Sequence, residues 1–524
     1  MKNRKIVNVL LFALLISSLL MLQSCGKCRH KYENGSSICS KCESPCNHTE
    51  INYKRICDEC GNPIASEGLE FETNYDGTCT LISMGSCKDK YVVIPSESED
   101  GDIVVDISSN AFAHYFYTML TSQVISVTIP ETVNKIPINA FYACSSLQTI
   151  TVNENNLYFK SNDGVLYTKD GTKLLKYPTA KKNTNFEVPN GVEVIDRDSF
   201  ERVYDLESVV LPEGLKSIYS AFKECKQLKS INIPSSVTYI DGTAFYECEN
   251  IIQKENGIHY VDTWVVNADT DIQTITLRDN TVGFAEYAFS GCNNLTGYTV
   301  PENIKHISGS AFRDCANLTY LNIHSGVIDI GYCLTGNSTK LTAITVDEEN
   351  PNYKTIDGNL YTKDGKTLIQ YAAGKTDEKF TVPNDVKTIK HYAFLGASNL
   401  KSITMSNNVT SIEYGAFYNC KGLTSLTLPN GITKIASYTF GHCENLETVI
   451  IPTSVTLIET EAFIECLDFK TVFIPKSVTV VEEDAFSKCT NLRVCCEAES
   501  EPVGWDYYWH RGLPLGVYWG YKNN

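Results

Sequence analysis

Hydrophobic and polar residues follow a short pattern that returns every 23 residues along the chain. The phenylalanine of an Ala-Phe-x-x-Cys-like phrase shows this spacing in one run of five and in two pairs: Phe394, Phe417, Phe440, Phe463 and Phe486, then Phe222/Phe245 and Phe289/Phe312. A period of this length is typical of stacked supersecondary units, so it predicts a repeat solenoid. Because stacked coils offer a long and regular surface, the pattern favours binding over catalysis.

Each period contains a short strand followed by a turn. In the repeat that ends at Cys443, Leu426 and Leu428 alternate with polar neighbours, which predicts a half-buried strand. Pro429 ends this strand because proline has no N–H to donate to a ladder. Phe440 and Cys443 lie three residues apart, which is the spacing of a helical or 3₁₀ turn with one buried side. A single coil cannot cover its own apolar face, so we expect stacking to bury it.

The repeats resemble the BspA-like leucine-rich repeats of bacterial surface proteins, whose pattern is L-x-x-I-x-I-P-x-x-V-T-x-I-x-x-x-A-F-x-x-C. The clearest matches are Ile231–Cys248, Leu400–Cys420, Leu423–Cys443, Leu446–Cys466 and Phe469–Cys489. Weaker matches surround Phe112, Phe141, Phe200 and Phe289, and a degenerate coil lies near Val327–Val346. The resemblance covers roughly residues 69–524. It implies a right-handed leucine-rich-repeat coil over residues 106–496, preceded by a linker and a cap or first coil at 63–105.

Two longer segments, 156–188 and 352–382, interrupt the period and resemble each other. Each holds two Asp-Gly pairs between alternating apolar residues: Asp163-Gly164 and Asp170-Gly171, then Asp357-Gly358 and Asp364-Gly365. This is a strong hairpin signal, so each segment is predicted to be a small β-meander that extends one coil. Gly257–Val266 looks like a third, diverged copy. We interpret the aspartates as turn residues, with calcium binding as the less favoured alternative.

The first 24 residues form a targeting segment. Three basic residues precede a mostly apolar run, Ile6–Leu22, which is short for a transmembrane helix. Leu22-Gln23-Ser24-Cys25 resembles a bacterial lipobox, and this resemblance implies cleavage before Cys25 and attachment of lipid to it. An ordinary secretory signal and an uncleaved anchor are the alternatives.

The chain is acidic, with 45 Lys and Arg against 62 Asp and Glu and a formal net charge of −17. Loss of the three basic residues in the targeting segment would make the charge −20. Nucleic acid and anionic membrane surfaces would be repelled, so neither is expected as a ligand. The lipid is therefore the one membrane contact that we expect.

Residues 25–62 contain a tandem Cys/His unit. Cys28-x-His30 and Cys39-x-x-Cys42 are followed by Cys46-x-His48 and Cys57-x-x-Cys60, so every Cys and His returns after 18 residues. Each set supplies the three thiolates and one imidazole of a closed tetrahedral zinc site, which would be structural and not catalytic. The two units resemble short zinc-ribbon modules. Disulfides in an oxidising compartment are the alternative, and either kind of staple suits a segment too short to form a core.

Nine further cysteines lie three residues after a repeat phenylalanine: Cys144, Cys225, Cys248, Cys292, Cys315, Cys420, Cys443, Cys466 and Cys489. We expect them to form a column of buried thiols inside the solenoid, where a thiol acts as a small apolar group. Cross-links between neighbouring coils are the alternative.

Motifs of common enzyme classes are missing from the sequence. It contains no H-E-x-x-H, G-x-S-x-G, P-loop or dinucleotide fingerprint, so we expect no catalysis. The tail, 497–524, carries Trp505, Trp509 and Trp519 and is predicted to cap the last coil. A carbohydrate-stacking platform built on Trp505 and Trp509 is the alternative.

Outward-facing strand positions form polar columns along the repeats. One column reads Ser402, Ser425, Thr448 and Thr471, and the next reads Thr404, Thr427, Ile450 and Phe473. Threonine suits the packing of strands, but the second column becomes apolar at its end. Ile450 and Phe473 are thus a candidate contact patch, with burial under the tail as the alternative.

Family resemblance also implies a function. It predicts an exported cell-surface lipoprotein that adheres to host extracellular proteins or to other cells without catalysis. A scaffold for a surface complex of sister lipoproteins and a glycan-binding module using the C-terminal aromatic residues are the alternatives.

Overall fold

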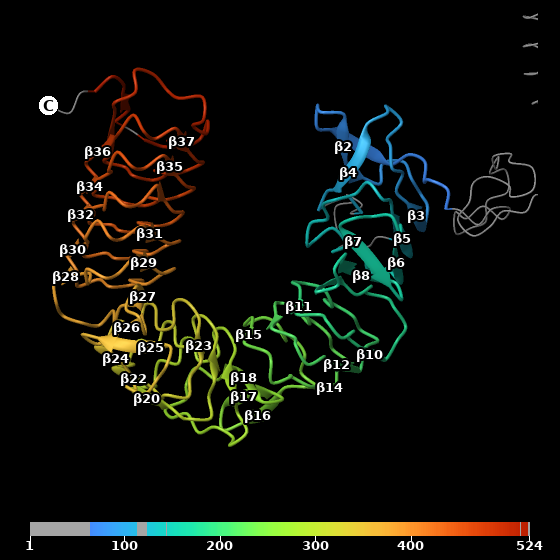
Figure 1. Cartoon of the computed structure of the whole chain (residues 1–524), viewed down its shortest axis with the longest axis horizontal. Helices are drawn as coiled ribbons and strands as arrows, with labels where there is room; N and C mark the ends of the chain where they lie inside the picture. Colours follow the sequence, from blue (N-terminus) through green and yellow to red (C-terminus); the bar gives the residue numbers. More distant parts are fainter. Residues whose placement is uncertain (1–62, 110, 113–122, 143, 514, 522–524) are drawn as a thin grey trace, which may run out of the picture. The chain divides into compact units, whose positions relative to one another are not determined.

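The computed structural model describes residues 63–524 apart from 110, 113–122, 143, 514 and 522–524 (Figure 1). The predicted targeting segment 1–24, the lipidation residue Cys25 and the Cys/His module 25–62 therefore lie outside the described residues. The chain divides into two compact units, Met1–Lys182 and Asn183–Asn524.

The second unit is a solenoid in which each coil contributes two short strands. The first strand of each coil pairs in parallel with the first strand of the next coil, and the second strands do the same. Figure 1 shows these strands side by side from β28 to β36. Ser402, Ser425 and Thr448 are successive partners, so one step along the ladder equals one 23-residue period. The predicted leucine-rich-repeat coil is confirmed.

The first strands form three ladders. Their members are β10 (Asn185–Glu187), β12 (Ser208–Val210) and β14 (Ser230–Ile231); β20 (Gly297–Val300), β22 (Tyr320–Ile323) and β24 (Ala343–Val346); and β28 (Lys379–Thr381), β30 (Ser402–Thr404), β32 (Ser425–Thr427), β34 (Thr448–Ile450), β36 (Thr471–Ile474), β38 (Arg493–Cys496) and β39 (Val517–Tyr518).

The second strands of the regular coils are each two residues long. They are β11 (Val194–Ile195), β13 (Ser217–Ile218), β15 (Tyr239–Ile240), β19 (Gly283–Phe284), β21 (His306–Ile307), β23 (Asp329–Ile330), β29 (Thr388–Ile389), β31 (Ser411–Ile412), β33 (Lys434–Ile435), β35 (Leu457–Ile458) and β37 (Val480–Val481).

Between the second strand and the next first strand, the chain turns around the repeat phenylalanine. Cys443 N donates to Phe440 O at 3.1 Å, which is the predicted one-sided turn with its i→i+3 bond. No α- or 3₁₀-helix is assigned among the described residues. Tyr438 (φ 56°) and His442 (φ 57°) flank the turn in the left-handed region, so the backbone cannot continue as a right-handed helix at either end.

The phenylalanine rings of successive coils stack into a continuous core. Phe417–Phe440, Phe440–Phe463 and Phe463–Phe486 have centroid distances of 5.4, 5.1 and 5.0 Å and nearly parallel planes. All four side chains are fully buried. Stacking of offset rings adds to the hydrophobic gain, so each coil is stabilised mainly by its two neighbours.

Two β-meanders interrupt the stacking in the second unit. They are β16 (Gln253–Glu255), β17 (Ile258–Val261) and β18 (Trp264–Ala268), and β25 (Tyr353–Ile356), β26 (Asn359–Thr362) and β27 (Thr367–Gln370). Within each meander the strands pair antiparallel. The last strand then pairs in parallel with the next second strand, β18 with β19 and β27 with β29. The meanders therefore occupy second-strand positions, and the first-strand ladder is divided where each one enters.

The first unit contains β1 (Glu70–Thr73), β2 (Thr78–Ser83), β3 (Tyr91–Val93), β4 (Ile103–Ile107), β5 (Ser126–Ile129), β6 (Thr149–Val152), β7 (Phe159–Asn162), β8 (Val165–Thr168) and β9 (Lys173–Lys176). Here β3, β5 and β6 form a parallel ladder, and β7, β8 and β9 form the meander predicted near 156–188. At its first turn Asp163 (φ 47°) and Gly164 (φ 75°) are both left-handed, as a two-residue type I′ hairpin requires.

The tail packs on the last coil of the second unit. Its strand β39 pairs in parallel with β38, and Trp505 and Trp509 belong to the hydrophobic core that runs through the preceding coils. Trp509 contacts Phe486, the last ring of the phenylalanine stack, with centroids 6.0 Å apart. These contacts cover the end of the core, which is what a solenoid cap must do.

Candidate functional site

The predicted outward columns of the strand face lie in register. Thr427, Ile450 and Phe473 are successive partners on β32, β34 and β36, and the column continues through Cys495 to Tyr518. Ile450 is 59% exposed and Phe473 is 36% exposed. The candidate pair therefore lies at the surface.

The tail adds two rings to this pair. Tyr521 packs against Phe473 with ring centroids 5.4 Å apart, and Tyr518 lies under the guanidinium of Arg493 at 5.3 Å. Both tyrosines keep more than two fifths of their surface exposed. We call Ile450, Phe473, Tyr518 and Tyr521 the C-terminal apolar patch.

Two hollows adjoin the C-terminal apolar patch. A shallow groove of about 540 Å³ runs over β30, β32 and β34 and includes Ile450. A smaller hollow of about 120 Å³ lies beside Phe473 and Tyr521. The patch thus has both apolar side chains and concave relief, which are the features a protein partner would fill.

Trp505 and Trp509 face inward. Trp509 is fully buried and its Nε1 donates to Glu501 Oε1 at 2.7 Å, while Trp505 Nε1 donates to Val478 O at 3.3 Å. Neither ring face is presented to solvent in this arrangement. The predicted carbohydrate platform therefore has no exposed indole at these two positions, because both rings are used to close the core.

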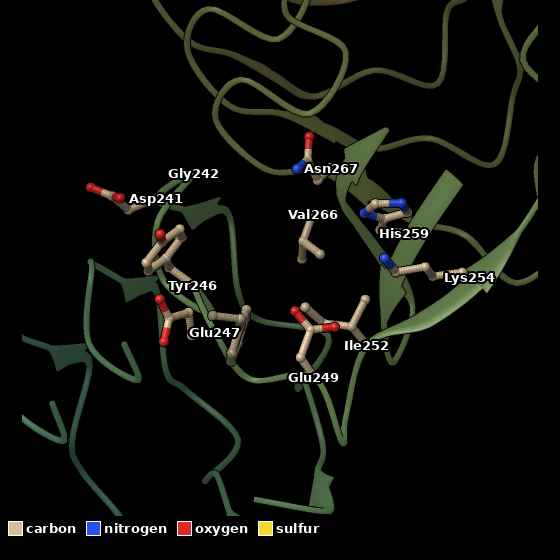
Figure 2. Close-up of a pocket in the computed structure, with 11 residues that line it drawn as sticks. Asp241, Gly242, Tyr246, Glu247, Glu249, Ile252, Lys254, His259, Val266 and Asn267 are labelled. Atoms are coloured by element: carbon tan, nitrogen blue, oxygen red, sulfur yellow. The ribbon is translucent and has the colours of Figure 1, made fainter. Parts of the chain in front are cut away.

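A further pocket lies beside the meander formed by β16, β17 and β18 (Figure 2). It has a volume of about 320 Å³, and its walls come from the coil at 241–249 and from β16, β17 and β18. Lys254, His259 and Asn267 line the meander side, and Glu247 and Glu249 line the repeat side. His259 Nε2 lies 3.0 Å from Asp269 Oδ1. None of these residues was a candidate from the sequence, although the break in the 23-residue period marks the place.

A family model described as a BspA type leucine-rich repeat region, matched in six copies, covers residues 102–163, 177–259, 265–364 and 371–493. These segments make up more than half of the chain. The chain belongs to the BspA-type leucine-rich repeat family. The comparison with curated proteins finds no match.

Several solved structures are similar to this BspA-type chain. A leucine-rich cell surface protein from Faecalibacterium prausnitzii is 26% identical over 87% of this chain and 98% of its own, with a TM-score of 0.36. A leucine-rich repeat protein from Eubacterium ventriosum is 20% identical over 70% of this chain and 94% of its own, with a TM-score of 0.36. The pneumococcal vaccine antigen PcpA is 19% identical over 83% of this chain and 88% of its own, with a TM-score of 0.35.

The cysteine column of the BspA-type repeats consists of buried thiols. In four successive coils the thiol donates to the carbonyl of the phenylalanine one coil earlier: Cys420 to Phe394, Cys443 to Phe417, Cys466 to Phe440 and Cys489 to Phe463, at 3.0–3.2 Å. Burial raises the pKa of Cys443 to about 12, so its thiolate is not formed near neutral pH. These thiols therefore supply packing and hydrogen bonds inside the solenoid.

The Asp-Gly turns of the meanders bind lysine side chains. Lys181 Nζ lies 2.6 Å from Asp163 O and 3.1 Å from Asp163 Oδ2, and Lys375 Nζ lies 2.6 Å from Asp357 O and 2.9 Å from Asp357 Oδ2. In both meanders the lysine ammonium group contacts the backbone carbonyl and the carboxylate of the turn aspartate. This arrangement supports the interpretation of these aspartates as turn residues.

Two buried asparagines, Asn156 and Asn350, have a structural role that was not predicted from the sequence. Asn350 is fully buried, and its amide donates to the carbonyls of His324 and Val327 and accepts from the N–H groups of Asn352 and Tyr353. Asn156 makes the same four kinds of bond in the first unit. Each lies three residues before the first strand of a meander. Their matching positions at the start of two similar segments are the sequence feature from which they could have been predicted.

The zinc sites and the lipid attachment that the sequence predicts lie before residue 63. In the part that the structure describes, no group of His, Cys, Asp and Glu side chains is arranged to hold a metal ion, and no helix has the length and apolar character to cross a bilayer. The predicted zinc ligands Cys28, His30, Cys39, Cys42, Cys46, His48, Cys57 and Cys60 lie outside the described residues, as does Cys25.

Proposed function

We propose that this BspA-type protein is a non-catalytic, cell-surface binding protein whose strand face docks a partner protein. The single observation that carries the proposal is the C-terminal apolar patch, which is exposed at the end of an otherwise polar parallel ladder. Exposed apolar side chains grouped in this way mark interaction sites more often than isolated ones do.

The composition around the patch supports a protein partner. Tyrosine, phenylalanine and arginine are enriched in the centres of protein interfaces, and Phe473, Tyr518 and Arg493 lie together on β36, β39 and β38. Lysine–glutamate pairs such as Lys470–Glu447 (2.8 Å) run beside them and supply a polar rim. An apolar centre with a charged rim is the usual anatomy of a specific contact.

Location and anchoring belong to the same proposal. The lipobox-like Leu22–Cys25 supports export and a lipid on Cys25, and the acidic chain has no reason to bind anionic lipid directly. The tandem Cys/His unit, read as two structural zinc sites, would form a small folded module between the lipid and the repeats. Extracellular host proteins or surfaces of other cells are the partners that this location offers.

A capture experiment followed by matched variants tests the docking face. The full mature chain is used to capture proteins from host extracellular matrix and from bacterial surface extracts. Affinity for the captured partner is then measured for the double variant Ile450→Asp/Phe473→Asp and for Thr299→Asp/Thr345→Asp, which places the same two charges on the polar strands β20 and β24, outside the patch and its two hollows.

We expect the Ile450→Asp/Phe473→Asp variant to weaken binding by about tenfold or more and Thr299→Asp/Thr345→Asp to leave it unchanged, because burying a charge in an interface centre is costly. Equal affinities for both variants would contradict the proposed face. Capture of sister lipoproteins alone would favour the scaffold function over adhesion.

A further inference from the structure

Another hollow of the second unit, with a volume of about 590 Å³, is built differently from the strand face. Four tyrosines line it, Tyr219, Tyr239, Tyr287 and Tyr332, together with Glu286 and Asp241. Tyr219 and Tyr239 are in ring contact at 5.4 Å, and Tyr287 and Tyr332 are about two fifths exposed. Aromatic faces and carboxylates thus open onto the same space.

The hollow exists because the β16–β18 meander interrupts the ladder of second strands. β15 pairs with β13 and is the last strand of its sheet, since the next position in the ladder is taken by β18. Residues of later coils bond to the edge of β15 that has no strand partner. Glu286 N donates to Ile240 O at 2.8 Å, and Ile240 N donates to Ser308 Oγ at 3.3 Å. A regular coil would fill this space with the next strand.

Glu286 is held at the back of the hollow. It is only 5% exposed, and the hydroxyls of Tyr239 and Tyr332 donate to its Oε2 and Oε1 at 2.7 and 2.9 Å. Burial raises the pKa of this carboxyl. Each carboxyl oxygen can accept a second hydrogen bond, so Glu286 can still serve a ligand hydroxyl.

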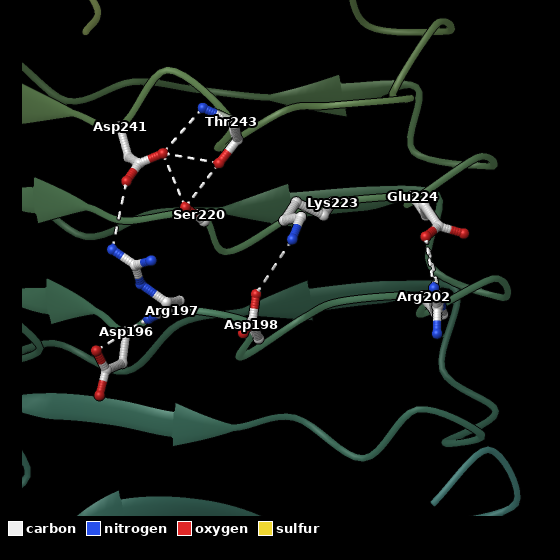
Figure 3. A network of polar contacts seen from close by, with 9 residues as sticks. All are labelled: Asp196, Arg197, Asp198, Arg202, Ser220, Lys223, Glu224, Asp241 and Thr243. Carbon is white, nitrogen blue, oxygen red and sulfur yellow. Dashed lines mark hydrogen bonds and ion pairs between the residues drawn. The ribbon is translucent and has the colours of Figure 1, made fainter. Parts of the chain in front are cut away.

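Asp241, which lines the same hollow, is surrounded by hydrogen-bond donors (Figure 3). Ser220 Oγ and Thr243 Oγ1 donate to its Oδ1 at 2.8 Å each, and Arg197 Nη2 lies 3.9 Å from Oδ2. The hollow therefore combines one paired carboxylate with one buried carboxyl of raised pKa. Both carboxyl groups are hydrogen-bonded by protein hydroxyls, and the hollow offers several hydroxyl donors and acceptors, which suits a neutral polyhydroxylated ligand.

A row of partly exposed rings continues from the hollow along the neighbouring coils. We call its members, His391, Tyr392, Tyr414, Tyr418, Tyr438 and His442, the tyrosine track. Tyr332 of the hollow contacts His391 at 5.8 Å, and the contacts continue from His391 to Tyr414 at 6.5 Å and from Tyr414 to Tyr438 at 5.2 Å.

The spacing of the track fits a chain of sugar rings. Tyr414 and Tyr438 come from successive coils, and coils in a parallel ladder repeat at about 4.8 Å, close to the length of one pyranose unit. The apolar C–H face of a pyranose can stack on an aromatic ring while its hydroxyls remain at the edges for hydrogen bonding. Nucleic acid, which also stacks on aromatic rings, is disfavoured by the net charge of −17.

We propose that the Glu286 hollow and the tyrosine track together bind a neutral oligosaccharide of several pyranose units. One end of the ligand lies in the hollow, with hydroxyls bonded to Glu286 and the surrounding side-chain hydroxyls. The following units stack on the track. This site is separate from the C-terminal apolar patch and from the C-terminal tryptophans, and it is independent of the protein-docking function proposed above.

Calorimetric titration of the full mature chain tests the proposal. The probes are hexasaccharides of glucose, mannose, xylose and N-acetylglucosamine, with a proline-rich decapeptide as the competing kind of ligand, because such peptides also lie on aromatic grooves. The variants are Tyr332→Ala, Tyr414→Ala and Glu286→Gln. Tyr320→Ala is the matched control, since Tyr320 is 46% exposed on the strand face.

We expect at least one hexasaccharide to bind, and Tyr332→Ala and Tyr414→Ala each to weaken it by about tenfold. Glu286→Gln should weaken it as well, while Tyr320→Ala and the Ile450→Asp/Phe473→Asp protein should bind as the unmodified chain does. The more conservative Tyr414→Phe keeps the ring and the fold and should retain most of the affinity.

Three results would overturn the proposal. The first is that no hexasaccharide binds at millimolar concentration. The second is that Tyr332→Ala and Tyr320→Ala bind the sugar equally well. The third is that the proline-rich peptide binds and the sugars do not, with the peptide lost in Tyr332→Ala, which would assign the site to a protein ligand.

Discussion

The thiol of each repeat cysteine is a hydrogen-bond donor of small volume, and the degenerate coil shows that sulfur itself is not required. In that coil Ser338 Oγ donates to Phe312 O at 3.1 Å, as Cys443 Sγ does to Phe417 O at 3.1 Å. The sequence predicts an apolar column from the spacing alone. It gives no sign of the hydrogen bond, because the donor and the acceptor belong to different coils.

Replacing Cys443 tests the role of this bond. Cys443→Ser keeps a small donor and should cost about 1 kcal/mol or less of unfolding free energy, whereas Cys443→Ala loses the donor and leaves a void and should cost about 1–3 kcal/mol. Denaturant unfolding of both variants provides the measurement. A serine variant less stable than the alanine variant would show that the thiol acts only as an apolar filler.

Glu286 gives the stability a pH dependence with a definite sign. Its pKa is raised by burial above the ordinary value of 4.5, so the folded state holds the proton more tightly than the unfolded state does. This contribution is complete below the ordinary pKa and is lost as pH rises through the folded-state value. The slope is at most about 1.4 kcal/mol per pH unit.

Glu286→Gln is neutral at every pH and provides the comparison. Unfolding free energies measured from pH 4 to pH 8 should show the unmodified protein losing stability relative to this variant as pH rises. Tyr239, Tyr332, Asp241 and Arg197 face the carboxyl in both proteins, so their titration largely cancels. A difference that stays flat, or one that grows in favour of the glutamate, would contradict the assignment.

Meanders are the elements that depend most on single side chains. The amide of Asn350 holds two carbonyls of the preceding coil and two N–H groups at the start of β25. It therefore fixes the point at which the meander leaves the coil. Unsatisfied buried backbone groups are expensive, so this side chain matters more than its polar character suggests.

Asn350→Ala should accordingly cost about 2–4 kcal/mol. Asn352→Ala is the matched control, because Asn352 is exposed and makes one side-chain bond, to Ile328 O at 2.9 Å; it should cost less than about 1 kcal/mol. Denaturant unfolding, with limited proteolysis at the 353–370 meander, measures both. Similar costs would mean that the asparagine amide does not hold the meander.

Strands and meanders could be predicted from the sequence because their signals are local. The alternation around Leu426 marks β32, and the Asp-Gly pairs mark the hairpins. The Phe440–Cys443 spacing predicts a turn but cannot show that Tyr438 and His442 adopt left-handed conformations, since neither is glycine. The Glu286 hollow could not be predicted either, because it arises where a meander displaces a coil and gathers tyrosines from distant repeats.

At the scale of the whole molecule, the metal content of the protein tests the prediction that residues 25–62 hold two zinc sites. We expect two zinc ions per chain in protein purified without chelator, and one after Cys39→Ser/Cys42→Ser, because each Cys₃His set is closed. Elemental analysis gives the stoichiometry. Chelation should expose residues 28–60 to protease and leave the unfolding of the repeats unchanged. No zinc, together with no titratable thiol among the eight ligands, would establish disulfides.

The short ladders also determine how the second unit would respond to tension if, as proposed above, the protein is anchored by its lipid and holds a partner on its strand face. Successive second strands share only two residues of register, as in β33 and β35, so the load falls on a few hydrogen bonds at a time. Coils at an end should therefore detach one after another instead of shearing together. Each 23-residue coil releases about 80 Å of chain when it detaches, so we expect the solenoid to lengthen stepwise while the contact holds.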